Sequence, residues 1–477
     1  MKSMTKYFGA ILGVILMLCY GCTRENYLDF QPRGIVIPSK IEDFRSLLDQ
    51  VDVNLNSRDF SLSTGFGRHH GQTVYMSDNQ FIDDDIFVAF GTDAFITRIY
   101  LFEETVFNSQ EDDADWSLYY SQIYAANVVL EGLESVVDGT AEEIAELRAE
   151  ARLHRAFAYF NLVNIYGLHY NPATADQDLG VPIRQGTLLE GVDLTRASVQ
   201  EVYDYLLNDI LESIDDLRDV QEANLTFRPS KAGAYGLLAK VYLFQGQYEG
   251  ALEACNQGLA LKNNIRDSND DRESSFVPGL ISFPNIPDDE QLVWFKQVRF
   301  QDIFPTDELL DLYEPNDLRL KWFTQATEFF GSLDSDQLYY GAADDTGNYY
   351  MGINTTDLYL IRAECHARLG NTTLSNTDLN TLRINRFPTG AYNPISISND
   401  DDLLQFVKDE RRREMVGSVE RTFDIKRYNL FDDDNIDVTH TLNGRTETLR
   451  ANSLNWAFPI ATRYIQQNPE LEQNPRD

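Results

Sequence analysis

The stretch Glu150–Gly167, EARLHRAFAYFNLVNIYG, constrains the fold of this chain more than any other part of it. Apolar and small residues recur there at spacings of three and four along two faces of a helical repeat, and only a narrow polar strip remains. A helix that is apolar on two sides must be buried between neighbours, so we expect a stack of helices around it. Its polar residues Arg155 and Asn161 are expected to be satisfied interior groups and not catalysts.

Helical signals continue on both sides of this stretch. Apolar spacing predicts a helix over residues 116–137, and Thr140 followed by Glu143 forms a capping box that opens the central helix. These two helices are expected to form an antiparallel hairpin. A second capping box, Ser198 followed by Glu201, predicts a helix over residues 199–217.

Residues 231–261 carry a repeat pattern. Six residues there match the spacing of the tetratricopeptide repeat, a helix-turn-helix unit of about 34 residues: Leu238, Ala239, Tyr242, Gly246, Tyr248 and Ala251. A weaker copy occupies residues 357–386. Because such units stack into a superhelix, the predicted fold is mostly α, a tetratricopeptide-like helical solenoid with a loop-rich, aromatic-rich inserted subdomain.

The predicted helical repeats cover about residues 115–262 and 355–430, and loop-rich, aromatic-rich segments cover about 54–107 and 263–350. Loops of this size inside a helical array are usually functional. By residue type and location, the candidate ligand-binding side chains are Tyr75, Trp294, Trp322, Tyr339 and Tyr340. A place in the core or at an interface is the alternative for each of them.

The N-terminus has the layout of a lipoprotein signal peptide, with Lys2 and Lys6 before an apolar run that ends in Gly21-Cys22. That run is too short to span a bilayer comfortably. We therefore expect residues 1–21 to be removed, Cys22 to carry the lipid, and residues 22–477 to form a single domain. Simple secretion, with cleavage nearby, is the alternative.

The net charge and the missing catalytic motifs argue against several classes of function. The net charge of −36, from 76 acidic and 40 basic residues, argues against a nucleic-acid partner because no basic surface is available to release counterions. The sequence has no Walker loop, GxSxG elbow, HExxH or paired CxxC motif, and we expect no metal site, with calcium at one of the Asp runs left open. Cys255 and Cys365 are expected to be buried apolar side chains, and a disulfide between them stays open.

Several blocks of the chain resemble the SusD/RagB family of nutrient-capturing surface lipoproteins. The central stretch with the YGLHYNPATADQDLGVPI that overlaps its end resembles the signature helix and loop of that family. DERRREM and ERTFDIKRYN resemble its C-terminal arginine-rich block, and the tail WAFPIATRYIQQNPELEQNP matches its closing segment. The resemblance runs from Cys22 to the end of the chain.

This resemblance implies a lipid-anchored, non-enzymatic protein of the outer membrane that faces the cell exterior. It implies no cofactor, and it implies that the protein binds a nutrient, which we expect to be a glycan, and delivers it to a SusC-like TonB-dependent transporter. Aromatic rings would stack on sugar rings, and neighbouring polar side chains would bond the hydroxyls. A tetratricopeptide scaffold that binds proteins or peptides is the first alternative, and a lipid-anchored glycoside hydrolase with a carboxylate pair is the second.

Overall fold

The computed structural model of the protein describes residues 38–50, 65–69, 71–82, 84, 87, 94–274, 280–284, 289–299, 304–325, 338–342 and 348–477. The chain divides into two units, Met1–Ser39 and Lys40–Asp477. Only Pro38 and Ser39 of the first unit are described, so the predicted signal peptide and Cys22 lie outside the described residues. All elements named below belong to the second unit.

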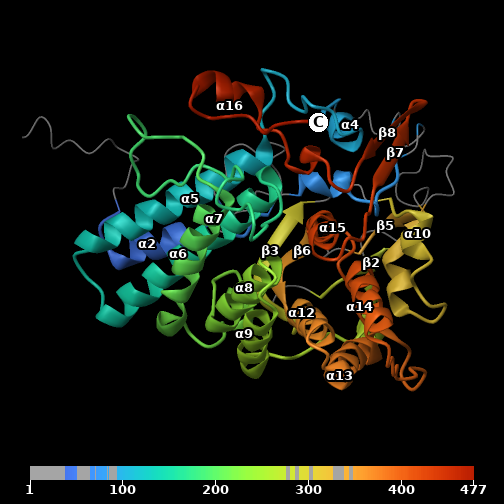
Figure 1. The fold of residues 1–477 in the computed structure, drawn as a ribbon. Coiled ribbons are helices and arrows are strands. Elements are labelled where there is room, and N and C mark those ends of the chain that lie inside the picture. Colours follow the sequence, from blue (N-terminus) through green and yellow to red (C-terminus); the bar gives the residue numbers. More distant parts are fainter. Residues whose placement is uncertain are drawn as a thin grey trace, which may run out of the picture. The chain divides into compact units, whose positions relative to one another are not determined.

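Helical hairpins form the body of this unit (Figure 1). The hairpins are α5 (Ala114–Gly132) with α6 (Ala141–Tyr166), α8 (Lys231–Phe244) with α9 (Tyr248–Leu261), and α12 (Thr355–Arg368) with α13 (Thr372–Arg383). They are linked because α7 (Val199–Leu211) contacts both α6 and α8, and α9 contacts α12. α14 (Asp400–Glu414) extends the stack by packing on α12 and α13. The predicted mostly α, tetratricopeptide-like fold is confirmed.

Shorter elements complete the described part of the chain. The other α-helices are α2 (Ile41–Leu48), α4 (Ala94–Tyr100), α10 (Asp307–Leu310), α15 (Glu420–Phe431) and α16 (Thr462–Gln467). Short 3-10 helices are η3 (Gln72–Met76), η4 (Leu133–Ser135), η5 (Ile214–Asp216), η6 (Ala223–Leu225), η7 (Ser268–Asp270), η9 (Leu318–Trp322), η10 (Ile384–Arg386) and η11 (Leu454–Trp456). The strands pair as antiparallel ribbons: β1 (Arg272–Glu273) with β2 (Ile281–Ser282), β3 (Leu292–Arg299) with β6 (Asn348–Asn354), β4 (Phe323–Gln325) with β5 (Leu338–Tyr340), and β7 (Val438–Leu442) with β8 (Arg445–Leu449).

The central helix α6 has the predicted cap and burial. The Thr140 side chain accepts from the Glu143 N–H at 3.2 Å, and the Glu143 carboxylate accepts from the Thr140 N–H at 2.8 Å, which confirms the capping box. Arg155 donates two hydrogen bonds of 2.8 Å to Asp209, and the Asn161 amide donates to the Phe157 carbonyl at 2.8 Å. Both are satisfied interior groups, as expected.

The helix α7 begins at the predicted cap but ends earlier than predicted. The Ser198 side chain accepts from the Glu201 N–H, so the second capping box is confirmed. The helix ends at Leu211 and continues only as the 3-10 helix η5. After Leu211 the backbone bonds three residues back, with the Ser213 N–H donating to the Ile210 carbonyl at 3.0 Å and the Asp216 N–H to the Ser213 carbonyl at 3.2 Å, which is the 3-10 pattern. The prediction of one helix over 199–217 was therefore wrong at its C-terminal end.

The two described cysteines are free thiols. Cys255 lies on α9 and Cys365 on α12, and both side chains are fully buried. Burial raises the pKa of the Cys255 thiol well above its ordinary value, so the thiol stays protonated. The expectation of buried, apolar-type cysteines is confirmed.

The ribbon β3–β6 connects the inserted segment to the helices. Its register runs from Leu292 opposite Asn354 to Arg299 opposite Asn348. Gly352 of β6 has a φ of +102°, and a Cβ atom there would lie 2.3 Å from the Trp294 carbonyl oxygen, so only glycine fits.

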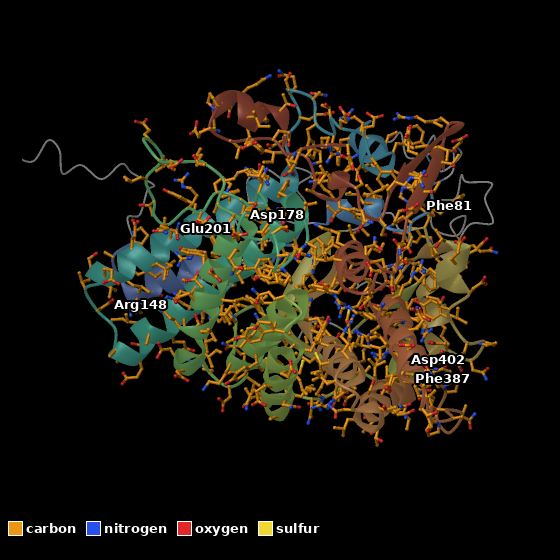
Figure 2. All side chains as sticks on the ribbon, viewed as in Figure 1. Phe81, Arg148, Asp178, Glu201, Phe387 and Asp402 are labelled. Atoms are coloured by element: carbon orange, nitrogen blue, oxygen red, sulfur yellow. The ribbon has the colours of Figure 1, made fainter. Side chains whose placement is uncertain are left out.

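The described part of the inserted segment has a small apolar core of its own. It consists of Val298, Leu309, Tyr313, Trp322, Phe323, Tyr340, Ala342 and Val416. Only Val416 in this set comes from the C-terminal part of the chain, just after α14. Figure 2 shows side chains filling the spaces between the ribbons of the fold. None of the helices in the described ranges has the length and apolar character needed to cross a membrane.

Candidate functional site

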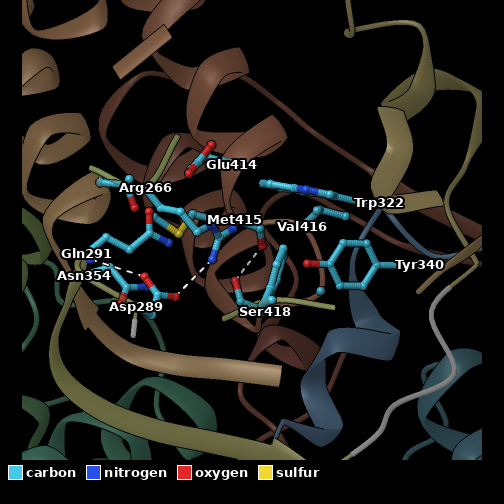
Figure 3. A pocket seen from close by; sticks show the side chains of 13 residues that line it. Arg266, Asp289, Gln291, Trp322, Tyr340, Asn354, Glu414, Met415, Val416 and Ser418 are labelled. Carbon is cyan, nitrogen blue, oxygen red and sulfur yellow. Dashed lines mark hydrogen bonds and ion pairs between the residues drawn. The ribbon is translucent and has the colours of Figure 1, made fainter. Parts of the chain in front are cut away.

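A pocket lies where the inserted segment meets the C-terminal end of α14 (Figure 3). Its cavity volume is about 70 Å³. It is lined by Arg266, Phe283, Asp289, Gln291, Trp322, Tyr340, Asn354, Thr356, Glu414, Met415, Val416, Gly417 and Ser418. Aromatic rings and polar side chains therefore face the same space.

The aromatic side of the pocket is built by η9 and the β4–β5 ribbon. Trp322 ends η9, and the next residue, Phe323, pairs with Tyr340 of β5, so the two pocket aromatics are placed together. The Trp322 indole N–H donates to the Asp271 carboxylate at 3.1 Å, and its ring meets the Phe283 ring edge-on at 5.5 Å between centroids. Trp322 is 3% exposed and Tyr340 is 5% exposed. A ligand would thus meet only the part of each ring that lines the pocket.

Arg266 dominates the polar side of the pocket. Its guanidinium pairs with Asp289 at 3.0 Å and with Asp271 at 3.3 Å, and it lies 4.0 Å above the Phe283 ring. Burial alone would lower the pKa of Arg266, but the two carboxylates outweigh burial and raise it. Asp289 also accepts from the Gln291 backbone N–H at 3.2 Å. On this side one guanidinium thus faces two carboxylates, and the ion pairs hold all three groups in place.

Asn354 contributes an acceptor that has no partner among the residues that the structure describes. It stands between the end of β6 and the start of α12, and its side chain makes no capping hydrogen bond. Its amide oxygen is buried without a hydrogen-bond partner among the described residues. Because a buried polar atom without a partner costs about 1–3 kcal/mol, this oxygen favours a ligand that donates a hydrogen bond to it.

An ion network lies directly behind the pocket. Arg319, which is fully buried, pairs with Asp317 at 2.7 Å, Glu410 at 2.8 Å and Glu414 at 2.9 Å. Arg386 pairs with Glu414 at 2.6 Å. Burial alone would raise the pKa of Glu410, but its arginine neighbours outweigh burial and hold it well below its ordinary value. Glu410 and Glu414 thus bond arginines across packed elements, which is a structural role.

The structure brings together only two of the five predicted ligand-binding side chains. Trp322 and Tyr340 line the pocket, whereas Tyr75, Trp294 and Tyr339 are 6%, 0% and 0% exposed and belong to the main apolar core. The Trp294 indole N–H donates to the Phe227 carbonyl at 3.2 Å. A direct contact between any of the five and a ligand stays a prediction.

Sequence reasoning missed the polar residues of the pocket. Arg266, Asp289, Gln291 and Asn354 stand at the edges of separate elements, and no short motif joins them. One signal was present for Asn354, because an asparagine just before a helix is a frequent cap residue whose amide can face a site.

The described residues contain no group of three or more His, Cys, Asp and Glu side chains that could hold a metal ion. Of the acidic runs considered for calcium, Asp432 and Asp434 form ion pairs with cationic side chains. Asp432 pairs with Arg368 at 2.6 Å, and Asp434 pairs with Lys408 at 2.7 Å.

Comparisons with known proteins match this chain along most of its length. A family model described as "Starch-binding associating with outer membrane" matches residues 26–243, and one described as "SusD family" matches residues 339–476. SusD-like protein P38 of Formosa agariphila is 24% identical over 432 residues, which cover 77% of this chain and 80% of that protein. A SusD-like protein of Bacteroides ovatus is 24% identical over 356 residues, which cover 70% of this chain but only 56% of that protein.

Solved structures share the fold. A SusD superfamily protein of Bacteroides thetaiotaomicron has a TM-score of 0.69 at 18% identity and covers 92% of this chain and 100% of that chain. A SusD-like carbohydrate binding protein of Bacteroides vulgatus has a TM-score of 0.66 at 18% identity and covers 91% of this chain and 98% of that chain. Two family models match the chain, and the relatives it matches are SusD-like proteins. The chain therefore belongs to the SusD/RagB family.

Proposed function

We propose that this protein is a non-enzymatic surface lipoprotein that binds a glycan and delivers it to a SusC-like TonB-dependent transporter of the outer membrane. The observation that carries the binding step is the pocket of Figure 3, in which Trp322 and Tyr340 lie beside Arg266, Asp289 and the partnerless oxygen of Asn354. The cavity of about 70 Å³ is smaller than a sugar ring, so we expect it to take one edge of a sugar, with its hydroxyls on the fixed polar groups and its C–H groups against the exposed parts of the two aromatic rings. The descriptions of the matched family and of its carbohydrate binding relative support the same ligand class.

The electrostatics of the pocket support binding without cleavage. A glycoside hydrolase needs one carboxylic acid whose pKa is raised, so that it can protonate the leaving oxygen. Burial alone would raise the pKa of Glu414, but Arg386 and Arg319 outweigh burial and lower it. Asp289 is likewise engaged in its ion pair with Arg266 at 3.0 Å. Glu414 and Asp289 are therefore ion-pair partners of arginines.

Affinity electrophoresis through gels that contain a panel of polysaccharides tests the glycan proposal. We expect the wild-type protein to be retarded by at least one of them, and Asn354→Ala to be retarded less, because the ligand loses one hydrogen bond, worth about 1 kcal/mol or a roughly fivefold weaker affinity. Asn208→Ala, on the exposed face of α7, is the matched control and should behave as wild type. Equal retardation of Asn354→Ala and wild type, or turnover of a bound polysaccharide by the purified protein, contradicts the proposal.

The anchor and the transporter need a separate test in cells. We expect Cys22→Ser to abolish the incorporation of labelled fatty acid and to release the protein from the outer membrane, whereas Cys19→Ser retains both properties. A tagged wild-type protein should co-purify with a TonB-dependent transporter from detergent-solubilised outer membranes. Labelling of Cys22→Ser at the wild-type level would exclude Cys22 as the lipidated residue.

A further inference from the structure

A second cavity lies away from the candidate pocket, beneath the loop that follows α6. It is formed by that loop, by α15 and by the segment after β8, and its volume is about 160 Å³. An engineered protein cavity of about 150 Å³ holds a benzene molecule, so this space can admit one six-membered ring. None of its lining residues lines the pocket of Figure 3.

The cavity contains a buried cation. The Lys426 side chain is 5% exposed, and its ammonium donates to the Asn164 and Gly167 carbonyl oxygens at 2.7 Å each. An ammonium has three N–H donors, so one remains after these two bonds. No carboxylate of the described residues forms an ion pair with Lys426, and burial lowers its pKa to about 7.

Two other buried lysines of this acidic protein, Lys240 and Lys408, are neutralised by carboxylates, whereas Lys296 donates to the Phe66 carbonyl, has no ion pair with a described carboxylate and lines neither cavity. Lys240 pairs with Asp357 at 2.9 Å and Glu420 at 2.7 Å, and Lys408 is paired with two aspartates. A buried charge without a counter-charge is costly. Burial therefore favours the neutral amine of Lys426, and an anion entering the cavity would stabilise its protonated form.

His169 adds a second polar group with capacity to bond a ligand. It lines the cavity and is 6% exposed, and although its ring lies near the Phe244 carbonyl, neither ring nitrogen has hydrogen-bond geometry to a described residue. The carboxylate of Asp178, labelled in Figure 2, also lines the cavity, but it accepts from the Thr174 hydroxyl at 2.6 Å. That bond engages one oxygen and leaves the negative charge of Asp178 in the wall, so an anionic ligand would have to lie on the Lys426 side of the cavity.

The rest of the wall is part apolar and part neutral polar. Leu430, Leu454 and Trp456 provide apolar surface, and Asn171 and Asn452 provide amides. This mixture matches a sugar ring, which has apolar faces and hydroxyl edges. A cation placed against such a wall favours a ring that also carries a negative group.

We propose that this cavity binds one acidic sugar residue, with its oxyanion against Lys426 and His169 and its ring beside Trp456. The shared chemistry is a negatively charged oxygen group on a single sugar ring, which a uronate carboxylate or a sulfate ester supplies equally. This assignment goes beyond the proposed function, because it adds a second site and fixes the charge of its ligand.

Titration calorimetry with glucuronate, glucose 6-sulfate and glucose on the full chain tests the proposal. We expect both anions to bind and glucose to bind more weakly by about tenfold or more, since a hydrogen bond to a charged group contributes about 1.5–3 kcal/mol. Tighter binding of glucuronate indicates that the natural ligand carries a carboxylate, and tighter binding of glucose 6-sulfate indicates a sulfate ester. Because binding of an anion raises the pKa of Lys426, the heat at about pH 8 should depend on the ionisation enthalpy of the buffer.

Three variants test whether Lys426 and the cavity around it are responsible for the preference for anions. Lys426→Met should lose the anion preference and the buffer-dependent heat, even though His169 remains. Asn452→Trp, at an exposed lining position, should block the cavity without removing a buried group. Lys231→Met, which removes one charge outside the cavity, is the matched control and should bind as wild type.

Glucose bound as tightly as glucuronate, or wild-type glucuronate binding by both folded Lys426→Met and Asn452→Trp, overturns the proposal. Asn354→Ala should retain wild-type glucuronate binding, so failure of this site and failure of the glycan pocket are distinguishable.

Discussion

The buried carboxyl of Asp113 makes the stability of the fold depend on pH. Asp113 caps α5, accepting from the Asp115 N–H at 3.2 Å and the Trp116 N–H at 3.3 Å, and the Tyr166 hydroxyl donates to it at 2.6 Å. Its side chain is fully buried, and burial raises its pKa from 3.8 to about 7 in spite of these bonds. Folded Asp113 therefore binds a proton that unfolded Asp113 has lost at intermediate pH.

The sign and size of the effect follow from the two pKa values. Below about pH 4 both states are protonated, and Asp113 has no unfavourable effect on the free energy of unfolding. As the pH rises from about 4 to about 7, the folded state loses stability, because it must bury a charge that the unfolded state exposes to water. A shift of about three units corresponds to about 4 kcal/mol.

Asp113→Asn removes this titration while keeping the shape of the side chain and one cap acceptor. We expect the variant to be slightly less stable than wild type at about pH 4 and to gain about 4 kcal/mol relative to it by about pH 8. Neutralising Asp113 also removes a like charge beside Asp115, which adds to the gain. Urea unfolding followed by tryptophan fluorescence at both pH values measures the difference.

Asp204→Asn is the matched control for this experiment, because it removes a carboxylate from the exposed surface of α7. Its stability relative to wild type should change by less than about 1 kcal/mol over the same range. If the stability of Asp113→Asn runs parallel to that of wild type from about pH 4 to about pH 8, the reasoning from burial is refuted.

Three further substitutions test the frame of the fold. Glu410→Gln removes the carboxylate with which the buried Arg413 forms its ion pair and which Arg319 and Arg383 share, and the free energy of unfolding should fall by about 3–5 kcal/mol in urea titrations; an unchanged midpoint would show that the network contributes little. Gly352→Ala places a Cβ atom against the Trp294 carbonyl and should lower the thermal midpoint, through a loss of roughly 1–3 kcal/mol in stability; a wild-type midpoint contradicts the strain. Ser198→Ala removes the cap of α7 and should cost about 1 kcal/mol, with recovery in Ser198→Asp; equal stability of all three proteins argues against the cap.

The helices could be predicted from the sequence because their signals are local. Periodic apolar residues and the capping boxes at Thr140 and Ser198 act within one or two turns, and the structure places both caps where the sequence predicts them. The C-terminal end of α7 was misjudged because the backbone changes to three-residue hydrogen bonds after Leu211, and apolar spacing does not distinguish such a turn from an α-helix.

The candidate site was only partly predictable, because its residues meet through tertiary packing. Aromatic side chains in the inserted segment were recognised, but the sequence does not say that Trp294 packs in the main core while Trp322 lines a pocket. Arg266 and Asn354 come from segments far apart in the chain, and they meet because Arg266 pairs with Asp289, just before β3, while β3 pairs with β6, which ends at Asn354. Non-local strand pairing of this kind leaves no short motif.

The register of the β3–β6 ribbon has a practical consequence for protein engineering. Arg299 and Asn348 are paired residues, so residues 300–347 leave the ribbon and return to it at neighbouring positions. The ends of a replacement segment between these two points need only span one strand-to-strand spacing, roughly 5 Å, but the segment must keep an arginine in the place of Arg319, because Glu410 and Glu414 of α14 pair with that guanidinium. Exchanging this segment between relatives that share the arginine would then test whether it sets ligand preference on the same helical frame.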